Sequence, residues 1–247
     1  MIKRLVLLPL LLLASATRAD EVTVAVAANF VGPMAKIAES FSAASGHEIK
    51  IAAGSTGKLY TQIKAGAPFQ VLLAADETTP SRLIAEGHAV AGSNFTYAVG
   101  QLVLWSAQPG LVDDHGAVLT QGRFAHLALA NSRLAPYGRA ASEVLQARGL
   151  AHALAPKVVT AENIAQAYQF VLSGNAELGF VALSQVSAPG RPARGSMWRI
   201  PQSLYGQIRQ DAVLLTAGAD SRAAAALLAY LKSAPARALI QSYGYRP

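Results

Sequence analysis

The chain contains no cysteine among its 247 residues. This absence excludes disulfides, thiolate metal sites and a cysteine nucleophile, and also a lipid-modified N-terminal cysteine. Histidine is sparse as well, and the five histidines show no metal-ligand spacing: His47, His88, His115, His126 and His152. We therefore expect neither a directly bound metal ion nor a cofactor.

Long apolar runs are equally scarce. The clearest one, Leu5–Leu13, follows Lys3 and Arg4 and is followed by small residues. This order is typical of a secretory signal peptide, and the run is about half the roughly 20 residues that a membrane-spanning helix needs. We predict a signal peptide over residues 1–19, cleaved after Ala19, with Ala16 as the alternative. Without a cysteine to carry a lipid, the mature protein is expected to be free in the periplasm.

Clustered charge of one sign is also missing. The formal net charge is +7, with 21 basic and 14 acidic residues. Three of the basic residues, Lys3, Arg4 and Arg18, lie in the predicted signal peptide, so the mature chain would carry +4. The remaining basic residues form no stripe interleaved with aromatic residues, which argues against nucleic-acid binding.

Strand-like and helix-like segments alternate along the rest of the chain. Such alternation predicts an α/β fold with mainly parallel sheets flanked by helices. The predicted strands are 22–27, 49–52, 69–73, 95–105, 127–130, 158–159, 178–182 and 212–216. The predicted helices are 33–44, a helix after 54–57 that ends at Gly66, 80–87, 138–148, 163–172, 222–231 and 235–243.

The β-rich run 95–105 is long enough to pass from one lobe into another. We therefore predict two lobes with a cleft between them. Lobe I comprises residues 20–98 and 212–247, and lobe II comprises residues 99–211. Ligands of open α/β sheets bind beyond the carboxyl ends of strands, where helices begin.

Four strand-to-helix turns carry the polar residues that could bind such a ligand. They are residues 27–29, 54–57, 135–138 and 161–164. The first turn of a helix has free N–H groups, and the helix dipole favours an anion there. Asn29, Ser55 and Thr56 add side-chain donors. The alternative for each turn is an ordinary N-cap, a role that Ser, Thr and Asn commonly fill.

These turns carry no charged residue beside the donors except Lys58 and Glu162. A site made only of neutral donors suits a fully deprotonated dianion. It penalises a protonated phosphate, whose hydroxyl would find no acceptor. The turns therefore predict an oxyanion site.

Signals for catalysis are weak. Residues 54–58, GSTGK, resemble the end of a nucleotide-binding loop, but Ala52 replaces its first glycine and Leu59 follows the lysine. No GxSxG motif is present, and Asp76 is predicted only to cap the helix that follows it. An enzyme should show a base and nucleophile near the turns. None is visible, so we expect a binding protein rather than an enzyme.

Several longer segments together resemble the molybdate-binding proteins of ABC transporters, a branch of the type II periplasmic binding proteins. The resemblance spans essentially the whole mature chain. It is carried by VAVAANF (24–30), GSTGKLYTQIKAGAPFQVLLAADETTP (54–80), FTYAVGQLVLWSA (95–107), NSRLAPYG (131–138), ELGFVALSQV (177–186) and YLKSAPARALIQSYGY (230–245).

The resemblance implies that molybdate or tungstate is held between the lobes by hydroxyls and backbone N–H groups, and is delivered to an ABC permease by a monomer. The implied site residues are Ala28, Asn29, Ser55, Thr56, Tyr137 and Ile164. Asn29 stands where many members have Ser, and Ala182 stands where many have a ligand-contacting Tyr. Sulfate, thiosulfate or another oxyanion is the alternative ligand, and an exported enzyme is the remote alternative.

Overall fold

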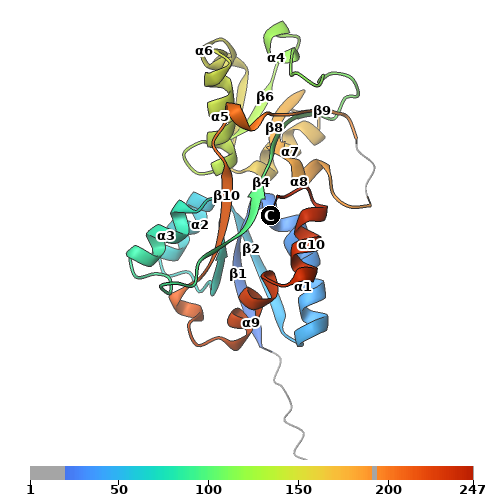
Figure 1. The fold of residues 1–247 in the computed structure, drawn as a ribbon. Helices are drawn as coiled ribbons and strands as arrows, with labels where there is room; N and C mark the ends of the chain where they lie inside the picture. Colours follow the sequence, from blue (N-terminus) through green and yellow to red (C-terminus); the bar gives the residue numbers. More distant parts are fainter. Residues whose placement is uncertain (1–19, 191–193, 247) are drawn as a thin grey trace, which may run out of the picture.

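Two α/β lobes are stacked end to end in the computed structural model, which describes residues 20–190 and 194–246 (Figure 1). The predicted signal peptide lies outside the described residues. Strands β4 and β10 run at mid-height, where the lobes meet, and the C-terminus lies close to them (Figure 1).

Lobe I is built around a five-stranded sheet of order β2-β1-β3-β10-β4. Strands β1, β2 and β3 are parallel, whereas β10 is antiparallel to β3 and β4. The strands are β1 (Glu21–Ala27), β2 (Glu48–Gly54), β3 (Val71–Leu73), β4 (Phe95–Gly100) and β10 (Ile208–Leu214). The helices are η1 (Ala28–Phe30), α1 (Val31–Ser45), α2 (Thr56–Lys64), α3 (Thr78–Ala85), η4 (Thr216–Gly218), α9 (Arg222–Leu231) and α10 (Ala234–Ser242).

Lobe II repeats this plan with the order β7-β6-β8-β5-β9. Strand β6 is parallel to β7 and β8, and β5 is antiparallel to β8 and β9. The strands are β5 (Leu102–Ser106), β6 (Leu127–Ala130), β7 (Val158–Ala161), β8 (Leu178–Ala182) and β9 (Ser196–Arg199). The helices are α4 (Val118–Gln121), α5 (Pro136–Ala147), α6 (Ala151–Leu154), η2 (Ala155–Lys157), α7 (Ile164–Leu172), α8 (Leu183–Val186) and η3 (Gln202–Leu204).

The predicted two-lobed α/β class is confirmed, but the sheets are mixed rather than mainly parallel. The antiparallel strands occur where the chain crosses from one lobe to the other. The run 95–105 is two strands, not one: β4 ends at Gly100 in the first sheet and β5 begins at Leu102 in the second. The predicted lobe boundaries, at 98/99 and 211/212, fall inside β4 and β10, which pair with each other.

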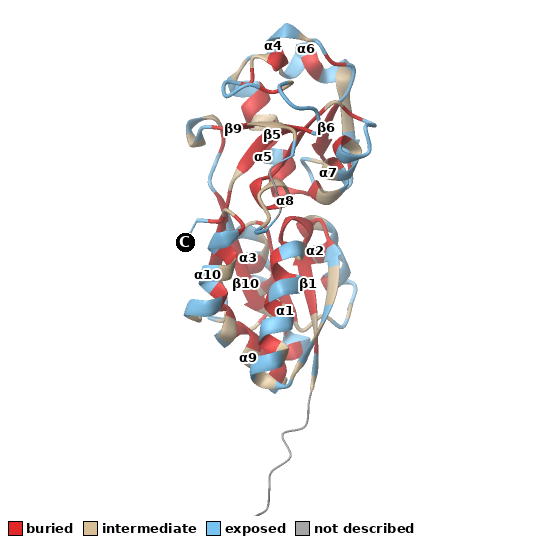
Figure 2. Cartoon of the chain, turned by 90° about the vertical axis from the view of Figure 1, so that its right-hand side faces the viewer, coloured by how far each residue is buried: buried red, intermediate tan, exposed pale blue. Residues whose placement is uncertain are grey.

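Each lobe has its own apolar core, with buried strands and helices whose outer faces are exposed (Figure 2). In lobe I, alternate residues of β1 meet the apolar face of α1, where Met34, Ile37 and Phe41 are buried. Gly46 ends α1 with a φ of 75°, a left-handed conformation that glycine adopts without a steric penalty. Helix η1 directly follows β1, and it lies at the edge of the lobe that faces lobe II.

Within the described residues, no single helix is long and apolar enough to cross a membrane. Helices α9 and α10 meet the length and composition criteria only as a pair, and that pair is bent by 63°.

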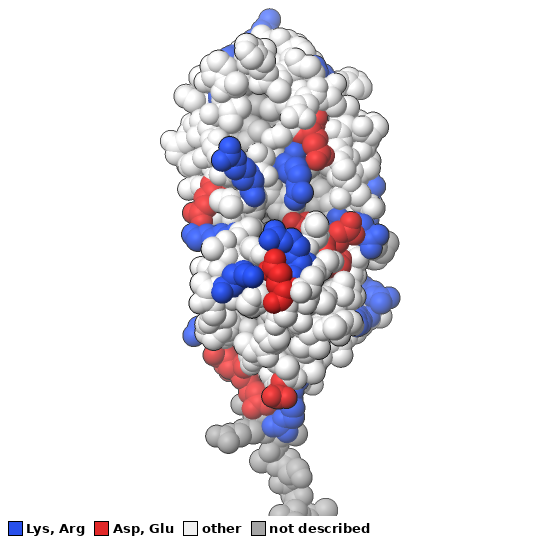
Figure 3. All heavy atoms as spheres, turned by 90° about the vertical axis from the view of Figure 1, so that its left-hand side faces the viewer, with Lys and Arg blue, Asp and Glu red and all other residues white. Residues whose placement is uncertain are grey.

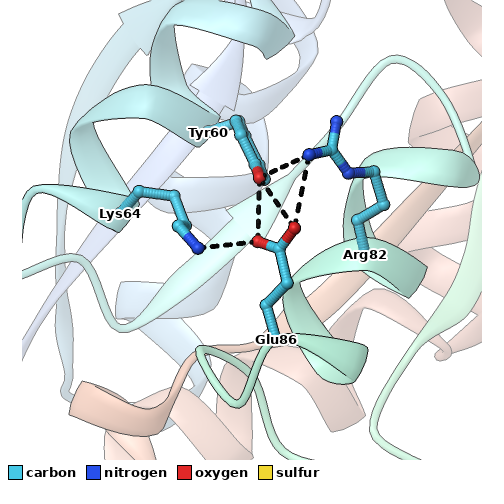
Figure 4. A network of polar contacts seen from close by, with 4 residues as sticks. All are labelled: Tyr60, Lys64, Arg82 and Glu86. Carbon is cyan, nitrogen blue, oxygen red and sulfur yellow. Dashed lines mark hydrogen bonds and ion pairs between the residues drawn. The ribbon is translucent and has the colours of Figure 1, made fainter.

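A polar network on the surface of lobe I joins α2 to the end of α3 (Figure 4). The Tyr60 hydroxyl donates to Glu86, Lys64 Nζ lies 3.0 Å from Glu86 Oε2, and Arg82 donates to Tyr60 Oη over 2.7 Å. The hydrogen bond from Tyr60, and then that from Lys64, lower the pKa of Glu86 to about 2 from its usual 4.5.

Replacing Glu86 with Gln should therefore lower the free energy of unfolding at neutral pH. A depressed folded-state pKa stabilises the fold above pH 4.5, and this contribution is lost as the pH falls towards 2. We expect wild type and Glu86→Gln to differ in urea denaturation at pH 7 and to converge near pH 2. Glu39→Gln, which removes only the pair with Lys36 inside α1, is the control and should have a smaller effect. A difference in the free energy of unfolding that persisted at pH 2 would show that the ionised Glu86 carboxylate is not its cause.

Candidate functional site

The starts of four helices meet at one small hollow between the lobes. Turns from lobe I lead into η1 and α2, and turns from lobe II lead into α5 and α7. All six site residues predicted from the sequence lie on this hollow, and every lining residue is uncharged. The lining residues are Ala27, Ala28, Asn29, Gly54, Ser55, Thr56, Ala75, Ala135, Pro136, Tyr137, Asn163 and Ile164.

Ser55 precedes α2 in the N-cap position, but its hydroxyl does not cap the helix. The side chain is buried, with 3% of the residue exposed, and Oγ has no hydrogen-bond partner. Ser221 and Ser233, by contrast, accept N–H bonds from α9 and α10 in the ordinary way. A buried hydroxyl without a partner costs free energy. Ser55 is therefore not an ordinary helix cap, and it carries an unpartnered hydroxyl on the lining of the hollow.

Thr56, the first residue of α2, is 1% exposed. Its Oγ1 accepts the backbone N–H of Ala75 over 3.0 Å, which anchors α2 to the end of β3. Because Oγ1 is the acceptor in that bond, the hydroxyl hydrogen remains available to donate. The sequence could not reveal Ala75 as a partner, since the contact depends on how β2 and β3 lie in the sheet.

Asn163 caps α7 and was not among the residues predicted for the site. Its Oδ1 accepts the N–H groups of Ala165 and Gln166, both over 3.0 Å. The cap therefore serves the second and third residues of α7 and leaves the N–H of Ile164, the first residue, to the hollow. On α5, Pro136 has no N–H, so Tyr137 carries the first backbone donor of that helix.

Asn29 requires a correction, because its side-chain amide does not offer a free donor to the hollow. Asn29 Nδ2 donates to Gln210 Oε1 and to Tyr245 Oη, each over 2.9 Å, and both amide hydrogens are thereby used. The carbonyl of Asn29 accepts from Ser184 Oγ and from Tyr245 Oη. Asn29 thus joins η1 to β10, to α8 and to the C-terminal segment.

The charged residues near the hollow are paired across the cleft. Lys58 Nζ of lobe I lies 2.6 Å from Glu162 Oε1 of lobe II, and Arg139 of lobe II lies 3.6 Å from Asp76 of lobe I. Asp76 Oδ1 also accepts the N–H of Thr79, which confirms its predicted capping role. Figure 3 shows basic and acidic side chains gathered at mid-height, where the lobes meet. Positive and negative charges thus offset each other outside an uncharged hollow.

Among residues 20–190 and 194–246, no group of three His, Asp or Glu side chains is placed to hold a metal ion. Hydroxyls and N–H groups are poor ligands for a bare cation but good donors to an anion. The hollow is therefore suited to a small anion.

A pair of α/β lobes whose helix N-termini face each other across a central hollow defines a two-lobed binding protein of the type II periplasmic class. The sequence agrees: residues 22–246 match the family model described as bacterial extracellular solute-binding protein. The chain belongs to this family.

Curated relatives and solved structures extend the comparison. The chain is 57% identical over 234 residues to the molybdate-binding protein ModA of Azotobacter vinelandii, covering 95% of this chain and 93% of that protein. It is 51% identical to ModA of Rhodobacter capsulatus, with 94% and 91% covered. The structure of a periplasmic molybdate-binding protein from Azotobacter vinelandii superposes with a TM-score of 0.89 at 40% identity, covering 92% of this chain and 99% of that one.

Replacing Ser55 with Ala in the ligand-free protein should leave the free energy of unfolding unchanged or raise it. The change removes a buried hydroxyl that has no partner, a group whose burial costs about 1–3 kcal/mol. Ser221→Ala is the matched control, because its hydroxyl accepts the N–H of Ala224, and loss of such a cap costs about 1 kcal/mol. Urea denaturation without any oxyanion measures both. An equal loss in the free energy of unfolding of Ser55→Ala and Ser221→Ala would show that Ser55 is an ordinary N-cap.

Proposed function

We propose that the chain is the extracytoplasmic solute-binding protein of an ABC importer, and that it captures molybdate or tungstate in the hollow between its lobes. The observation that carries the proposal is Ser55 Oγ, a buried donor without a partner in a site of neutral groups. The named molybdate-binding relatives, which match at 57% and 51% identity over most of the chain, support the ligand class.

The proposed donors come from both lobes. Ser55 and Thr56 supply hydroxyls, and the backbone N–H groups of Ala28 or Asn29, of Tyr137 and of Ile164 supply the others. Each N–H lies in the first turn of a helix, where the dipole adds favourable potential for an anion, about 0.3–1 kcal/mol per helix at exposed sites. Such a site stabilises a dianion without a charged side chain.

Selectivity against phosphate is expected because most of these donors are backbone N–H groups, which cannot accept a hydrogen bond. Molybdate, tungstate and sulfate carry no proton near neutral pH, whereas phosphate carries at least one. A phosphate hydroxyl in the hollow would find no acceptor at the backbone N–H groups and would compete for the few hydroxyl oxygens, whereas a fully deprotonated dianion accepts from every donor. Discrimination against sulfate must instead come from size, because molybdate and tungstate are larger anions.

The proposed role is binding and delivery rather than catalysis, and it requires no cofactor, since the oxyanion is the cargo. We place the protein in the periplasm, exported by the N-terminal signal peptide. It would act there as a monomer that presents the loaded, closed lobes to a permease in the inner membrane. The related molybdate-binding protein of known structure from Azotobacter vinelandii is described as periplasmic, which supports this location.

Titration calorimetry of the purified mature protein should show much tighter binding of molybdate and tungstate than of sulfate, and no binding of phosphate at pH 7. The physical reasons are the uncharged lining, whose N–H groups and hydroxyls donate to a fully deprotonated anion, and the larger size of molybdate and tungstate. Equal affinity for sulfate and molybdate would shift the proposal to the alternative oxyanions. Binding of none of the four would overturn it.

Individual donors should be separable by mutation. Thr56→Ala removes a hydroxyl donor to a charged ligand, a bond worth about 1.5–3 kcal/mol, so the affinity should fall about 10- to 150-fold. Ile164→Pro removes a backbone N–H at a helical position where proline is tolerated, and should weaken binding similarly. Ile164→Val is its control, because it trims the side chain but retains the N–H, and should bind almost as wild type. Circular dichroism checks folding. Wild-type affinity in folded Thr56→Ala and Ile164→Pro would place the ligand elsewhere.

A further inference from the structure

Tyr137 has a second connection besides its backbone N–H at the hollow. It lies in the first turn of α5 in lobe II, but its phenol oxygen accepts a hydrogen bond from Gln210 Nε2 on β10 of lobe I, over 3.1 Å. Both residues are buried: Tyr137 is 1% exposed and Gln210 is 0% exposed. A side chain from one lobe is therefore bonded to the strand that connects the two lobes.

The phenol fits into a notch that only glycine can leave open. Gly100 is the last residue of β4 and pairs with Ile208 of β10. A Cβ atom at Gly100 would lie 2.1 Å from Tyr137 Oη and 2.6 Å from Gln210 Nε2, both well inside contact distance. The φ of Gly100 is not positive, so the backbone alone does not require glycine here. Glycine is required here because the Tyr137 hydroxyl lies so close to the backbone.

The Gln210 amide is held in one orientation by its other bonds. Its Oε1 accepts from Asn29 Nδ2 over 2.9 Å and lies 3.0 Å from Tyr97 Oη. The amide nitrogen must then face Tyr137. A buried chain of hydrogen bonds consequently runs from Asn29 beside the hollow in lobe I, through Gln210 on the connecting strand, to Tyr137 beside the hollow in lobe II.

We propose that the Tyr137 side chain is a positioning group for ligand binding: its docking into the Gly100–Gln210 notch holds α5 so that the Tyr137 N–H and the lobe I donors face the same anion. This inference rests on the proposed function. The phenol acts through Gln210 and not by donating to the ligand. Burial raises the pKa of Tyr137 well above its usual value, so the phenol stays neutral throughout the working pH range.

Tyr137→Phe tests the proposal with a minimal change, because it removes the phenol oxygen and retains the ring and the backbone N–H. We expect the molybdate affinity measured by calorimetry to fall about ten-fold, equivalent to about 1.4 kcal/mol. Small-angle scattering should show less compaction on adding molybdate than in wild type. Gly100→Ala fills the notch and should reduce affinity and compaction at least as much.

Ser106→Ala is the matched control. It also removes a buried hydroxyl, which donates to the Glu177 carbonyl over 2.7 Å within lobe II and has no contact with Gln210. A purely structural role for such hydroxyls would lower the thermal stability of both variants alike. We expect Ser106→Ala to lose stability while its molybdate affinity stays within about two-fold of wild type.

The outcomes separate the two proposals. Tyr137→Phe and Gly100→Ala with wild-type affinity and compaction would overturn the positioning role while leaving the binding function intact. Equal losses of affinity in Ser106→Ala and Tyr137→Phe would overturn it too, because the effect would then be general destabilisation. A wild-type protein that binds no oxyanion would overturn the proposed function, and this inference with it.

Discussion

Backbone N–H groups at the start of a helix have no acceptor inside the helix, and the site of this protein depends on which other acceptors they find. In some helices a side chain is the acceptor: Ser221 and Ser233 cap α9 and α10, and Asn163 caps two N–H groups of α7. At the helices that meet at the hollow, some first-turn N–H groups have no side-chain acceptor. Ser55 does not cap α2, and α5 begins at Ala135–Pro136 without a side-chain cap. The free donors of both lobes therefore line the same hollow, and in the proposed function an anion between them would satisfy both sets.

The lining of the hollow is uncharged, so hydroxyl and N–H donors are the groups that it offers to an anion. An arginine in the lining would attract any anion, including protonated phosphate, whereas uncharged donors favour anions that are already fully deprotonated. The cations that do lie nearby, Lys58 and Arg139, are paired with acidic residues of the opposite lobe. Such exposed pairs contribute little to stability, but they connect the lobes at their rims and offset charges of opposite sign outside the hollow.

Much of the fold could be predicted from the sequence because its signals are local. The strands 127–130 and 178–182 and the helix 222–231 have the predicted bounds, and α1 ends at Gly46 as expected. Features that depend on the assembled sheets could not be predicted. Helix α1 begins at Val31 rather than Pro33, and β9 was missed. The run 95–105 divides between two sheets at Gly100 and Gln101, which interrupt its apolar pattern but do not by themselves assign the two halves to different sheets.

The six predicted site residues do meet at one hollow, since the turns after parallel strands lie at one edge of each sheet. The hydrogen-bond partners of each residue were harder to predict from the sequence. The two acceptors that occupy the Asn29 amide, Gln210 and Tyr245, are 181 and 216 positions further along the chain. No local pattern could therefore distinguish a free donor from a committed one, nor the capping serines from Ser55. The role of these residues in binding stays a prediction.

The position of β10 in the first sheet also determines the order in which the chain can fold. All five strands of lobe II lie between Leu102 and Arg199, so that lobe has its whole sheet before the C-terminal segment is available. Lobe I has β3 and β4 early but lacks β10, the strand that joins them, until residue 214 is available. Until then, β3 and β4 have unpaired edges, which favour aggregation, and closing the sheet requires contacts between residues far apart in sequence, which form slowly. All strands of lobe II therefore precede the strand that closes the sheet of lobe I, and a truncation before residue 208 would remove β10, α9 and α10 from the N-terminal lobe.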